Sequence, residues 1–355
     1  MECEKSIHRD YVRAIIEEIK AFESNFDEDV IVKTLYFGGG TPSYIDVEYI
    51  ENIVECLKEK FIFDNNIEAT IELNPGTTCY ENLKKYKEIG FNRVSMGLQS
   101  ANDKLLKIIG RIHNYDEFEE TYSNTRKAGF KNINVDLMIG LPDQTIEDVE
   151  DSLKRVIEKN PEHISVYSLI LEDGTKLKTM VEEGKLKLPS EDAERKMYWN
   201  VKEILESYEY KHYEISNYAK LGYESKHNMD CWKQKEYIAF GLAAHSYVNS
   251  IRYSNITDLN KYIYENLNKT YNCRIIEERQ DLKTKMNEFV ILGLRMIEGF
   301  SEQDFKSKFN TEFYKEYQNE FDKLSGMGLI QANGGRIALT RKGIDFANIV
   351  WCEFL

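Results

Sequence analysis

The first residues that could bind a ligand form a glycine turn. The apolar run Leu35–Phe37 stops at three consecutive glycines, which are followed by Thr41 and Pro42. Because glycine has no Cβ, the backbone N–H and C=O groups of Gly39 and Gly40 can come close to a ligand, and Pro42 restricts the preceding residue. The turn lacks both the lysine of a P-loop and the spacing of a dinucleotide fingerprint. A ligand with an amine and a carboxylate therefore fits it at least as well as a phosphate.

Polar side chains interrupt three later apolar runs near their carboxyl ends. They are Glu72 in EATIELN, Gln99 in RVSMGLQ and Asp136 in INVDLMI. Buried parallel strands normally form continuous apolar runs, and in a β/α barrel the strand ends face the active site. For any single residue, a strand-terminal polar group satisfied by a loop is the simpler interpretation. Three such residues plus the glycine turn indicate one shared ligand site.

These runs belong to a repeated unit of strand and helix. Strands are predicted at residues 32–37, 68–74, 93–99, 133–139 and 163–169. Helical spacing of apolar residues predicts helices at 9–26 and 50–61. The strand starts lie about 25 to 40 residues apart, the length of one βα unit. Since parallel neighbours need a crossover, this alternation predicts a parallel sheet.

The rest of the chain does not continue the alternation of strand and helix. After Pro189, Ser190 is a candidate N-cap for a long helix, and β-rich segments follow. The last part has three candidate helices and a hairpin around Asn333, which suggests a winged-helix module. Residues 283–355 hold ten basic and ten acidic side chains, so we expect a structural or partner-docking role rather than DNA binding. The predicted division is 1–189, 190–282 and 283–355.

Composition limits the classes of function. The net charge of −14 argues against a broad nucleic-acid surface. The six cysteines are scattered, a distribution typical of free thiols in a reducing compartment. The sequence has neither a signal-peptide apolar region nor an apolar run of membrane-spanning length. We therefore expect a cytoplasmic protein without stable membrane insertion.

Taken together, the motifs resemble one family. GGGTPS, IELNPG, VSMGLQS, NVDLMIGLPDQT, NPEHISVYSL, HYEISNYA, HNMDCW and LTRKG occur in this order along the chain. The order is similar to that of radical S-adenosylmethionine (radical SAM) proteins of the coproporphyrinogen III dehydrogenase group, and within it to the heme chaperones. The resemblance spans essentially the whole chain. It implies an α/β fold, a partial (β/α)6 radical SAM barrel with a small β-rich extension and a C-terminal winged-helix-like module.

The resemblance also implies roles in binding S-adenosyl-L-methionine. Gly39, Gly40 and Thr41 would hold the methionine moiety, and Glu72 would hold the cofactor by hydrogen bonding. Gln99 and Asp136 would contact the ribose hydroxyls. Arg111 would face the cofactor carboxylate, for which a guanidinium fork is suited, and Ile170 would lie near the adenine.

Family members carry a C-x3-C-x2-C loop after the first barrel strand, and its thiolates hold a 4Fe-4S cluster. This sequence has no such motif, and Cys3 is the only cysteine before the glycine turn. The resemblance implies that the first strand and the cluster loop are missing as one block. Because a cluster needs thiolate ligands, we expect this polypeptide, as written, to perform no radical chemistry and to be poorly stable, with an exposed sheet edge beside the glycine-turn strand.

The segment HNMDCW stands where the chaperones have HNxxYW, a motif associated with heme. His227 is thus a candidate heme ligand, and Asn228 could orient its ring. The motif tyrosine is replaced by Cys231, for which a buried inert thiol is the preferred interpretation over a thiolate ligand. His212 and His245 also occupy positions typical of the family, and we interpret both as structural.

Three functions remain open at the level of sequence. The first is a chaperone that binds heme and passes it to an unknown acceptor protein. The second is an oxygen-independent coproporphyrinogen III oxidase, which decarboxylates propionates through a 5′-deoxyadenosyl radical. The third is a non-catalytic binding remnant. The HNxxxW element favours the first over the second.

Overall fold

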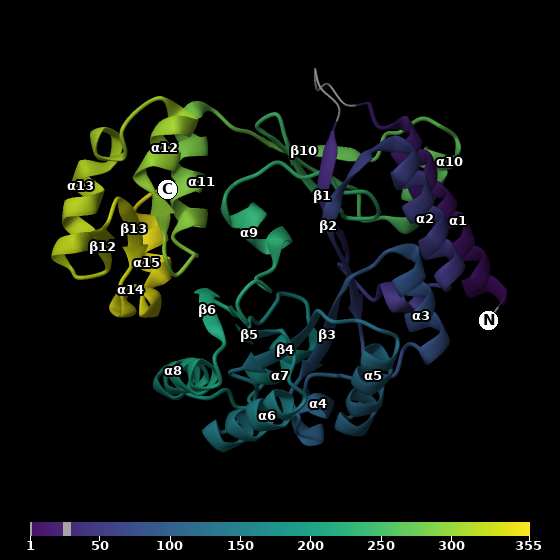
Figure 1. The fold of residues 1–355 in the computed structure, drawn as a ribbon, viewed down its shortest axis with the longest axis horizontal. Helices are drawn as coiled ribbons and strands as arrows, with labels where there is room; N and C mark the ends of the chain where they lie inside the picture. Colours follow the sequence, from purple (N-terminus) through teal and green to yellow (C-terminus); the bar gives the residue numbers. More distant parts are fainter. Residues whose placement is uncertain (1, 24–29) are drawn as a thin grey trace. The chain divides into compact units, whose positions relative to one another are not determined.

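The computed structural model describes residues 2–23 and 30–355, and the chain forms two compact units. The first unit consists of Met1–Leu35, Ile45–Ile67 and Ser225–Leu355. The second unit consists of Tyr36–Tyr44 and Glu68–Glu224. Strands β1 (Ile31–Phe37) and β2 (Ile62–Leu73) contribute residues to both units (Figure 1).

The largest sheet has the strand order β1-β2-β3-β4-β5-β7-β6. Its further strands are β3 (Arg93–Gln99), β4 (Ile133–Ile139), β5 (His163–Ser168), β6 (Lys211–Glu214) and β7 (Asn217–Ala219). The pairs β2–β3, β3–β4 and β4–β5 are parallel, whereas β5–β7 and β7–β6 are antiparallel. The sheet curls into the partial β/α barrel that the sequence predicts (Figure 1).

The predicted strands agree closely with the observed ones except at β2. This strand starts at Ile62 rather than at residue 68. Its first half contains Asp64, Asn65 and Asn66, residue types typical of turns. Asp64 indeed accepts a local hydrogen bond from the backbone N–H of Asn66 at 2.7 Å, yet the segment stays in the strand.

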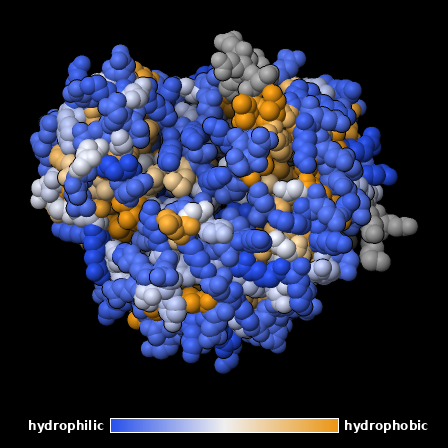
Figure 2. All heavy atoms as spheres, viewed as in Figure 1, coloured by the Kyte–Doolittle hydropathy of each residue, from blue (hydrophilic) through white to orange (hydrophobic). Residues whose placement is uncertain are grey.

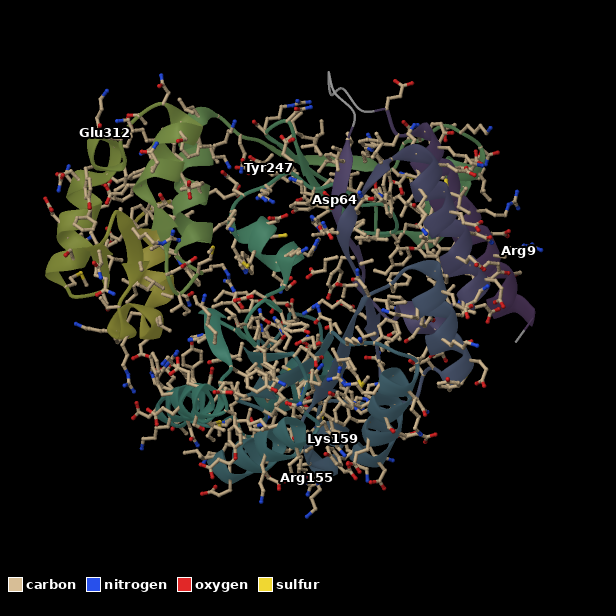
Figure 3. All side chains as sticks on the ribbon, in the orientation of Figure 1. Arg9, Asp64, Arg155, Lys159, Tyr247 and Glu312 are labelled. Carbon is tan, nitrogen blue, oxygen red and sulfur yellow. The ribbon has the colours of Figure 1, made fainter. Side chains whose placement is uncertain are left out.

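Helices connect the parallel strands of the second unit. They are α3 (Tyr80–Ile89), α4 (Asp103–Ile108), α5 (Tyr115–Lys127) and α6 (Ile146–Glu158), with α7 (Lys176–Glu182) and α8 (Glu191–Ser207) after β5. Capping boxes start α5 and α6. Arg155 of α6, which is labelled in Figure 3, covers the ring of Tyr115 on α5 at 4.9 Å from the ring centroid. Ser190 caps α8, as the sequence predicts.

A buried polar layer crosses the sheet of the second unit. The His163 ring contacts Asn134 Oδ1 at 2.6 Å through Nδ1 and the Tyr213 hydroxyl at 2.7 Å through Nε2. Asn134 in turn donates to Ser95 Oγ at 2.8 Å. Burial lowers the pKa of His163 well below its usual value, so the ring is neutral and both nitrogens take part in the network.

The first unit is built on helix α1 (Glu2–Ala21), which packs against α2 (Val47–Lys60) and α10 (Leu259–Leu267). Buried Glu18 anchors this packing. It accepts hydrogen bonds from the Tyr262 hydroxyl at 2.5 Å and from Asn255 Nδ2 at 2.7 Å. Residues 24–26 of the helix predicted at 9–26 lie outside the described residues.

A second sheet of this unit contains β8 (His245–Val248), β9 (Ile251–Asn255) and β10 (Arg274–Arg279). The C-terminal part contains α11 (Leu282–Gly293), α12 (Glu302–Phe309), α13 (Phe313–Gly326), α14 (Arg341–Asp345) and α15 (Ala347–Cys352), with the sheet β11-β13-β12. Its strands are β11 (Phe300–Ser301), β12 (Ile330–Asn333) and β13 (Arg336–Leu339). Aromatic side chains, among them Phe289, Phe305 and Tyr317, form its core. The predicted helices and hairpin are confirmed.

Hydrophilic residues cover most of the face shown in Figure 2, and apolar side chains gather in a few areas. Within the described residues, every helix is too short or too polar to cross a membrane. The proposed three-part division of the chain stays a prediction.

We predict that His212 makes the fold sensitive to acid. Its ring is 4% exposed, stacks on Tyr218 at 4.4 Å and has its pKa lowered by burial to about 4. Since the unfolded chain binds a proton below about pH 6.5 and the folded chain does not, the stability contributed by His212 is present above that pH and is lost toward pH 4. Between pH 7 and 5, wild type should lose about 2 kcal/mol more unfolding free energy than His212→Gln.

Urea unfolding at both pH values measures this difference, and His245→Gln serves as the control because His245 is an exposed histidine. An equal pH dependence for wild type and His212→Gln would contradict the assignment.

Candidate functional site

The three glycines after β1 differ in their surroundings or in their backbone conformation. A Cβ on Gly38 would lie 2.5 Å from the Tyr36 ring and 2.7 Å from the Glu72 carboxylate. Gly39 has φ of +78°, a conformation that favours glycine. A Cβ on Gly40 would meet nothing within 4 Å. The protein itself thus requires the first two glycines, whereas the backbone at Gly40 faces open space.

Glu72 closes the turn from the adjacent strand β2. Its carboxylate accepts a hydrogen bond from the Tyr36 hydroxyl at 2.8 Å and one from the backbone N–H of Gly39 at 3.2 Å. Burial raises the pKa of Glu72, and the negative charge of Asp136 raises it further. The carboxylate therefore carries strong acceptor oxygens beside the open glycine backbone.

Asn74 brings Thr41 and Arg111 together. Its Nδ2 donates to Thr41 Oγ1 at 2.7 Å, and its Oδ1 accepts from Arg111 Nη1 at 3.3 Å. Burial lowers the pKa of Arg111 and the Asp136 carboxylate raises it; the group remains a cation at neutral pH. A cation and a hydroxyl thus lie on the two sides of one amide.

Gln99 ends β3 in an unusual backbone conformation. Its φ is +71°, and the pairing with β4 shifts register between Gly97 and Gln99. A Cβ on Gly97 would lie 3.0 Å from Gln99 Nε2 and 3.5 Å from Asn74 Oδ1. The Gln99 amide and the Asn74 side chain therefore both lie beside Gly97. A backbone outlier such as that of Gln99 is typical of functional sites.

Asp136 occupies the neighbouring position on β4. Its carboxylate accepts from Asn134 Nδ2 at 2.7 Å and from Ser95 Oγ at 3.3 Å. Burial raises the pKa of Asp136. The negative charge of Asp136 raises the pKa of both Glu72 and Arg111. Asp136 therefore belongs to the same cluster of site residues.

Seven of the eight predicted cofactor residues thus lie at one edge of the sheet. Ile170 is the exception, because it follows β5 and its side chain is 75% exposed. Four residues that position the predicted ones were not foreseen from the sequence, namely Tyr36, Gly38, Asn74 and Ser95. A signal for Asn74 was present in the NPG that follows β2, since Asn, Pro and Gly together mark a turn at a strand end.

The candidate heme residue His227 belongs to the other unit, on the short helix α9 (Lys226–Trp232). Ser225 caps this helix by accepting a hydrogen bond from the backbone N–H of Asn228 at 3.3 Å. The Arg295 guanidinium covers the Trp232 ring at 4.2 Å and fixes the other end. His227 Nδ1 lies 3.1 Å from the Thr34 hydroxyl of β1.

Cys231 and the two histidines interpreted as structural have surroundings different from those of His227. Cys231 is partly buried, and burial raises the pKa of its thiol, which favours the neutral form over a thiolate. His212 is buried in the second unit, with Nε2 3.3 Å from the Ile215 carbonyl oxygen. His245 is exposed and lies 3.4 Å from the Glu277 carboxylate.

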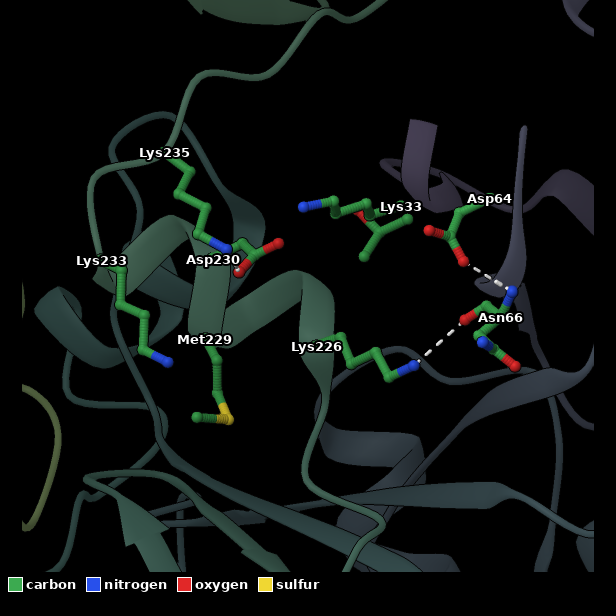
Figure 4. Close-up of a pocket in the computed structure, with 9 residues that line it drawn as sticks. Lys33, Asp64, Asn66, Lys226, Met229, Asp230, Lys233 and Lys235 are labelled. Atoms are coloured by element: carbon green, nitrogen blue, oxygen red, sulfur yellow. Dashed lines mark hydrogen bonds and ion pairs between the residues drawn. The ribbon is translucent and has the colours of Figure 1, made fainter. Parts of the chain in front are cut away.

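A cavity of about 390 Å³ lies beside α9 within the first unit (Figure 4). Its walls come from β1, β2 and the segment 226–235. Thr34, the partner of His227, is one of the lining residues. The candidate heme residue is therefore linked to the cavity through Thr34, although His227 itself is not one of the lining residues.

Comparison with known proteins agrees with this geometry. Residues 3–156 match the Radical SAM superfamily, and residues 280–346 match the HemN C-terminal domain. The fold is similar to a solved structure described as coproporphyrinogen III oxidase (HemN) from Escherichia coli, a radical SAM enzyme, with a TM-score of 0.84. That match has 22% identity and covers 99% of this chain and 83% of the other. The match to the superfamily model, together with this fold, defines a protein of the radical SAM class.

Two curated relatives define the family more narrowly. The chain is 36% identical over 345 residues to the heme chaperone HemW of Lactococcus lactis, a match that covers 97% of this chain and 89% of the relative. It is 34% identical to the heme chaperone HemW of Bacillus subtilis, over 91% of this chain and 86% of that protein. The chain belongs to the HemW family.

The site residues fit one of the two cofactors implied by this family. Open space over Gly39 and Gly40, beside carboxylates, an amide and a guanidinium, suits S-adenosylmethionine, which carries an amine, a carboxylate and a diol. A 4Fe-4S cluster needs thiolate ligands. The described residues contain no group of three or more His, Cys, Asp or Glu side chains that could hold a metal ion. They therefore do not fit the cluster.

We predict that substitution by alanine changes stability differently at two glycines of the turn, Gly38 and Gly40. Gly38→Ala should lower the unfolding free energy by about 1–3 kcal/mol, the usual cost of overpacking, because the new methyl group displaces Glu72 and Tyr36. Gly40→Ala should leave stability unchanged or raise it by up to about 1 kcal/mol, since the site is open and φ is unexceptional. Denaturant unfolding of both variants measures the contrast. Equal stabilities would contradict the described turn.

Proposed function

We propose that this protein binds heme through His227 and passes it to an acceptor protein. The observation that carries the proposal is His227 itself, set on a capped helix with its Nδ1 against Thr34 in a chain 36% identical to a heme chaperone. The likeness to coproporphyrinogen III oxidase extends to the fold alone, so no decarboxylation is proposed. The acceptor would be a further protein.

The hydrogen bond to Thr34 suits a metal ligand. An imidazole binds iron through one neutral nitrogen, and the group bonded to the other nitrogen sets the tautomer. Because Nδ1 lies 3.1 Å from the Thr34 hydroxyl, iron would bind through Nε2 with the proton held on Nδ1. Thr34 is thus proposed as a positioning residue.

We further propose that the edge of the central sheet holds S-adenosylmethionine. Gly39, Gly40 and Thr41 would hold the methionine amine, and Arg111 would face its carboxylate. Glu72 would accept hydrogen bonds from the cofactor. Gln99 and Asp136 would contact the ribose hydroxyls. Bound S-adenosylmethionine supplies a 5′-deoxyadenosyl radical when it is reduced. Because the described residues do not fit the cluster, cofactor binding is proposed without a radical step.

Two further predictions from the sequence remain proposals: the adenine contact of Ile170 and the cytoplasmic location. Ile170 would approach the adenine only in a bound state, because its side chain is largely exposed in the structure. A cytoplasmic location is consistent with the unpaired cysteines at positions 56, 79, 231, 273 and 352.

The test of heme binding is a titration with iron protoporphyrin IX followed by Soret absorbance. We expect saturable binding by wild type and an affinity at least tenfold weaker in His227→Ala, the loss of about 1.4 kcal/mol or more. His245→Ala is the matched control, because it removes an exposed histidine from the same unit and should bind heme as wild type does. Wild-type affinity in His227→Ala would overturn the proposal.

A further inference from the structure

The cavity beside α9 is rich in cations. Its lining side chains come from three segments and include four lysines and two aspartates; they are Lys33, Thr34, Asp64, Asn66, Lys226, Met229, Asp230, Lys233 and Lys235. Its volume of about 390 Å³ lies within the usual range for small-ligand sites. The chain as a whole has a net charge of −14, whereas the lysines outnumber the aspartates at this cavity and make its charge positive.

One face of α9 and its continuation forms the inner wall. Lys226, Met229, Asp230 and Lys233 follow each other at helical spacing, which places them on one side of the helix. The opposite wall comes from β1 and β2, which supply Lys33 and Asp64 (Figure 4). In Figure 4 the Lys33 side chain extends toward α9. Lysine side chains thus come from both walls of the cavity.

Several of the charges in the cavity are already engaged. Lys235 forms an ion pair with Asp230 at 2.6 Å, and Lys226 donates to the Asn66 carbonyl oxygen at 3.1 Å. The Asp64 carboxylate accepts from the backbone N–H of Asn66. Among the described residues, the ammonium groups of Lys33 and Lys233 have no hydrogen-bond or ion-pair partner. Two unpaired cations at one cavity are suited to a ligand with two negative charges.

Thr34 connects this cavity to the candidate heme residue. It lines the cavity next to Lys33, and its hydroxyl contacts His227 Nδ1 at 3.1 Å. Heme combines an iron, an apolar ring and two propionate carboxylates. The cavity supplies the matching groups in addition to His227, namely the Met229 side chain for apolar contact and two free ammonium groups for the carboxylates.

We propose that Lys33 and Lys233 bind the propionate carboxylates of the heme held by His227. The inference rests on the proposed function and adds to it how the protein orients its ligand. A free anion such as inorganic phosphate would satisfy the same lysines, but it would not use His227 or Met229. The connection through Thr34 favours a porphyrin dicarboxylate.

The experiment is a Soret titration of the full chain with iron protoporphyrin IX and, separately, with its dimethyl ester, which has no charged carboxylates. Lys33→Met/Lys233→Met should bind iron protoporphyrin IX about tenfold more weakly than wild type. The dimethyl ester should bind wild type about as weakly, and the double variant should not weaken it further. Higher salt should narrow the gap between wild type and variant, because salt screens exposed charges.

The matched control is Lys261→Met/Lys315→Met, which removes two exposed lysines from α10 and α13 of the same unit and touches neither the cavity nor a side-chain partner. It should bind heme as wild type does. Wild-type affinity in Lys33→Met/Lys233→Met, or equal affinity of wild type for heme and its ester, would overturn the inference while heme binding stands. A wild type that produces no saturable change in the Soret band would overturn the proposed function and the inference with it.

Discussion

The contact between the Glu72 carboxylate and the glycine turn, made through the backbone N–H of Gly39, fixes the geometry of the candidate cofactor site. A buried carboxylate loses hydration worth several kcal/mol, and two hydrogen bonds, from Tyr36 and from the backbone of Gly39, offset that loss at about 1.5–3 kcal/mol each. The contact leaves no room for a side chain at Gly38. It thereby ties the end of β1 to β2 and leaves the next stretch of backbone open.

The parallel sheet turns this local contact into a site. Its strands point their carboxyl ends to one edge, so residues far apart in sequence meet there. Asn74 joins Thr41 to Arg111, and Gln99 reaches the same place through a left-handed backbone conformation. The buried hydrogen-bond network around Asn134 holds the Asp136 carboxylate in place through a hydrogen bond from Asn134 Nδ2. Glu72, Gln99 and Asp136 lie on strands, and the glycine turn and Asn74 follow strands directly. Sites built on rigid elements have more precise geometry than sites on loops.

The sequence predicted the part of this arrangement that depends on local patterns. The strands β3 and β4 are buried apolar runs, so their positions and their polar ends, Gln99 and Asp136, could be predicted. The first half of β2 could not, because Asp64 and its neighbours have the composition of a turn. Local patterns determine where a strand ends, but they carry no information on side-chain partners such as Asn74.

Local sequence patterns could not predict which residues far apart in the chain come together in the fold. Lys33 and Lys233 line one cavity although two hundred residues separate them in the numbering. The sequence identified His227 only by resemblance, and it contained no sign of Thr34 as the partner of its ring. The engagement of Lys235 by Asp230, which leaves other lysines free, is likewise a property of the folded chain.

The central claim is that the open backbone at Gly40, together with Asp136, receives S-adenosylmethionine. Isothermal titration of the chain with S-adenosylmethionine tests it most directly when wild type is compared with Gly40→Ala, which is expected to be at least as stable as wild type. The account predicts saturable binding by wild type and at least tenfold weaker binding by Gly40→Ala, because the added methyl group occupies the space over the backbone. Equal affinities, or no binding by wild type, would contradict it.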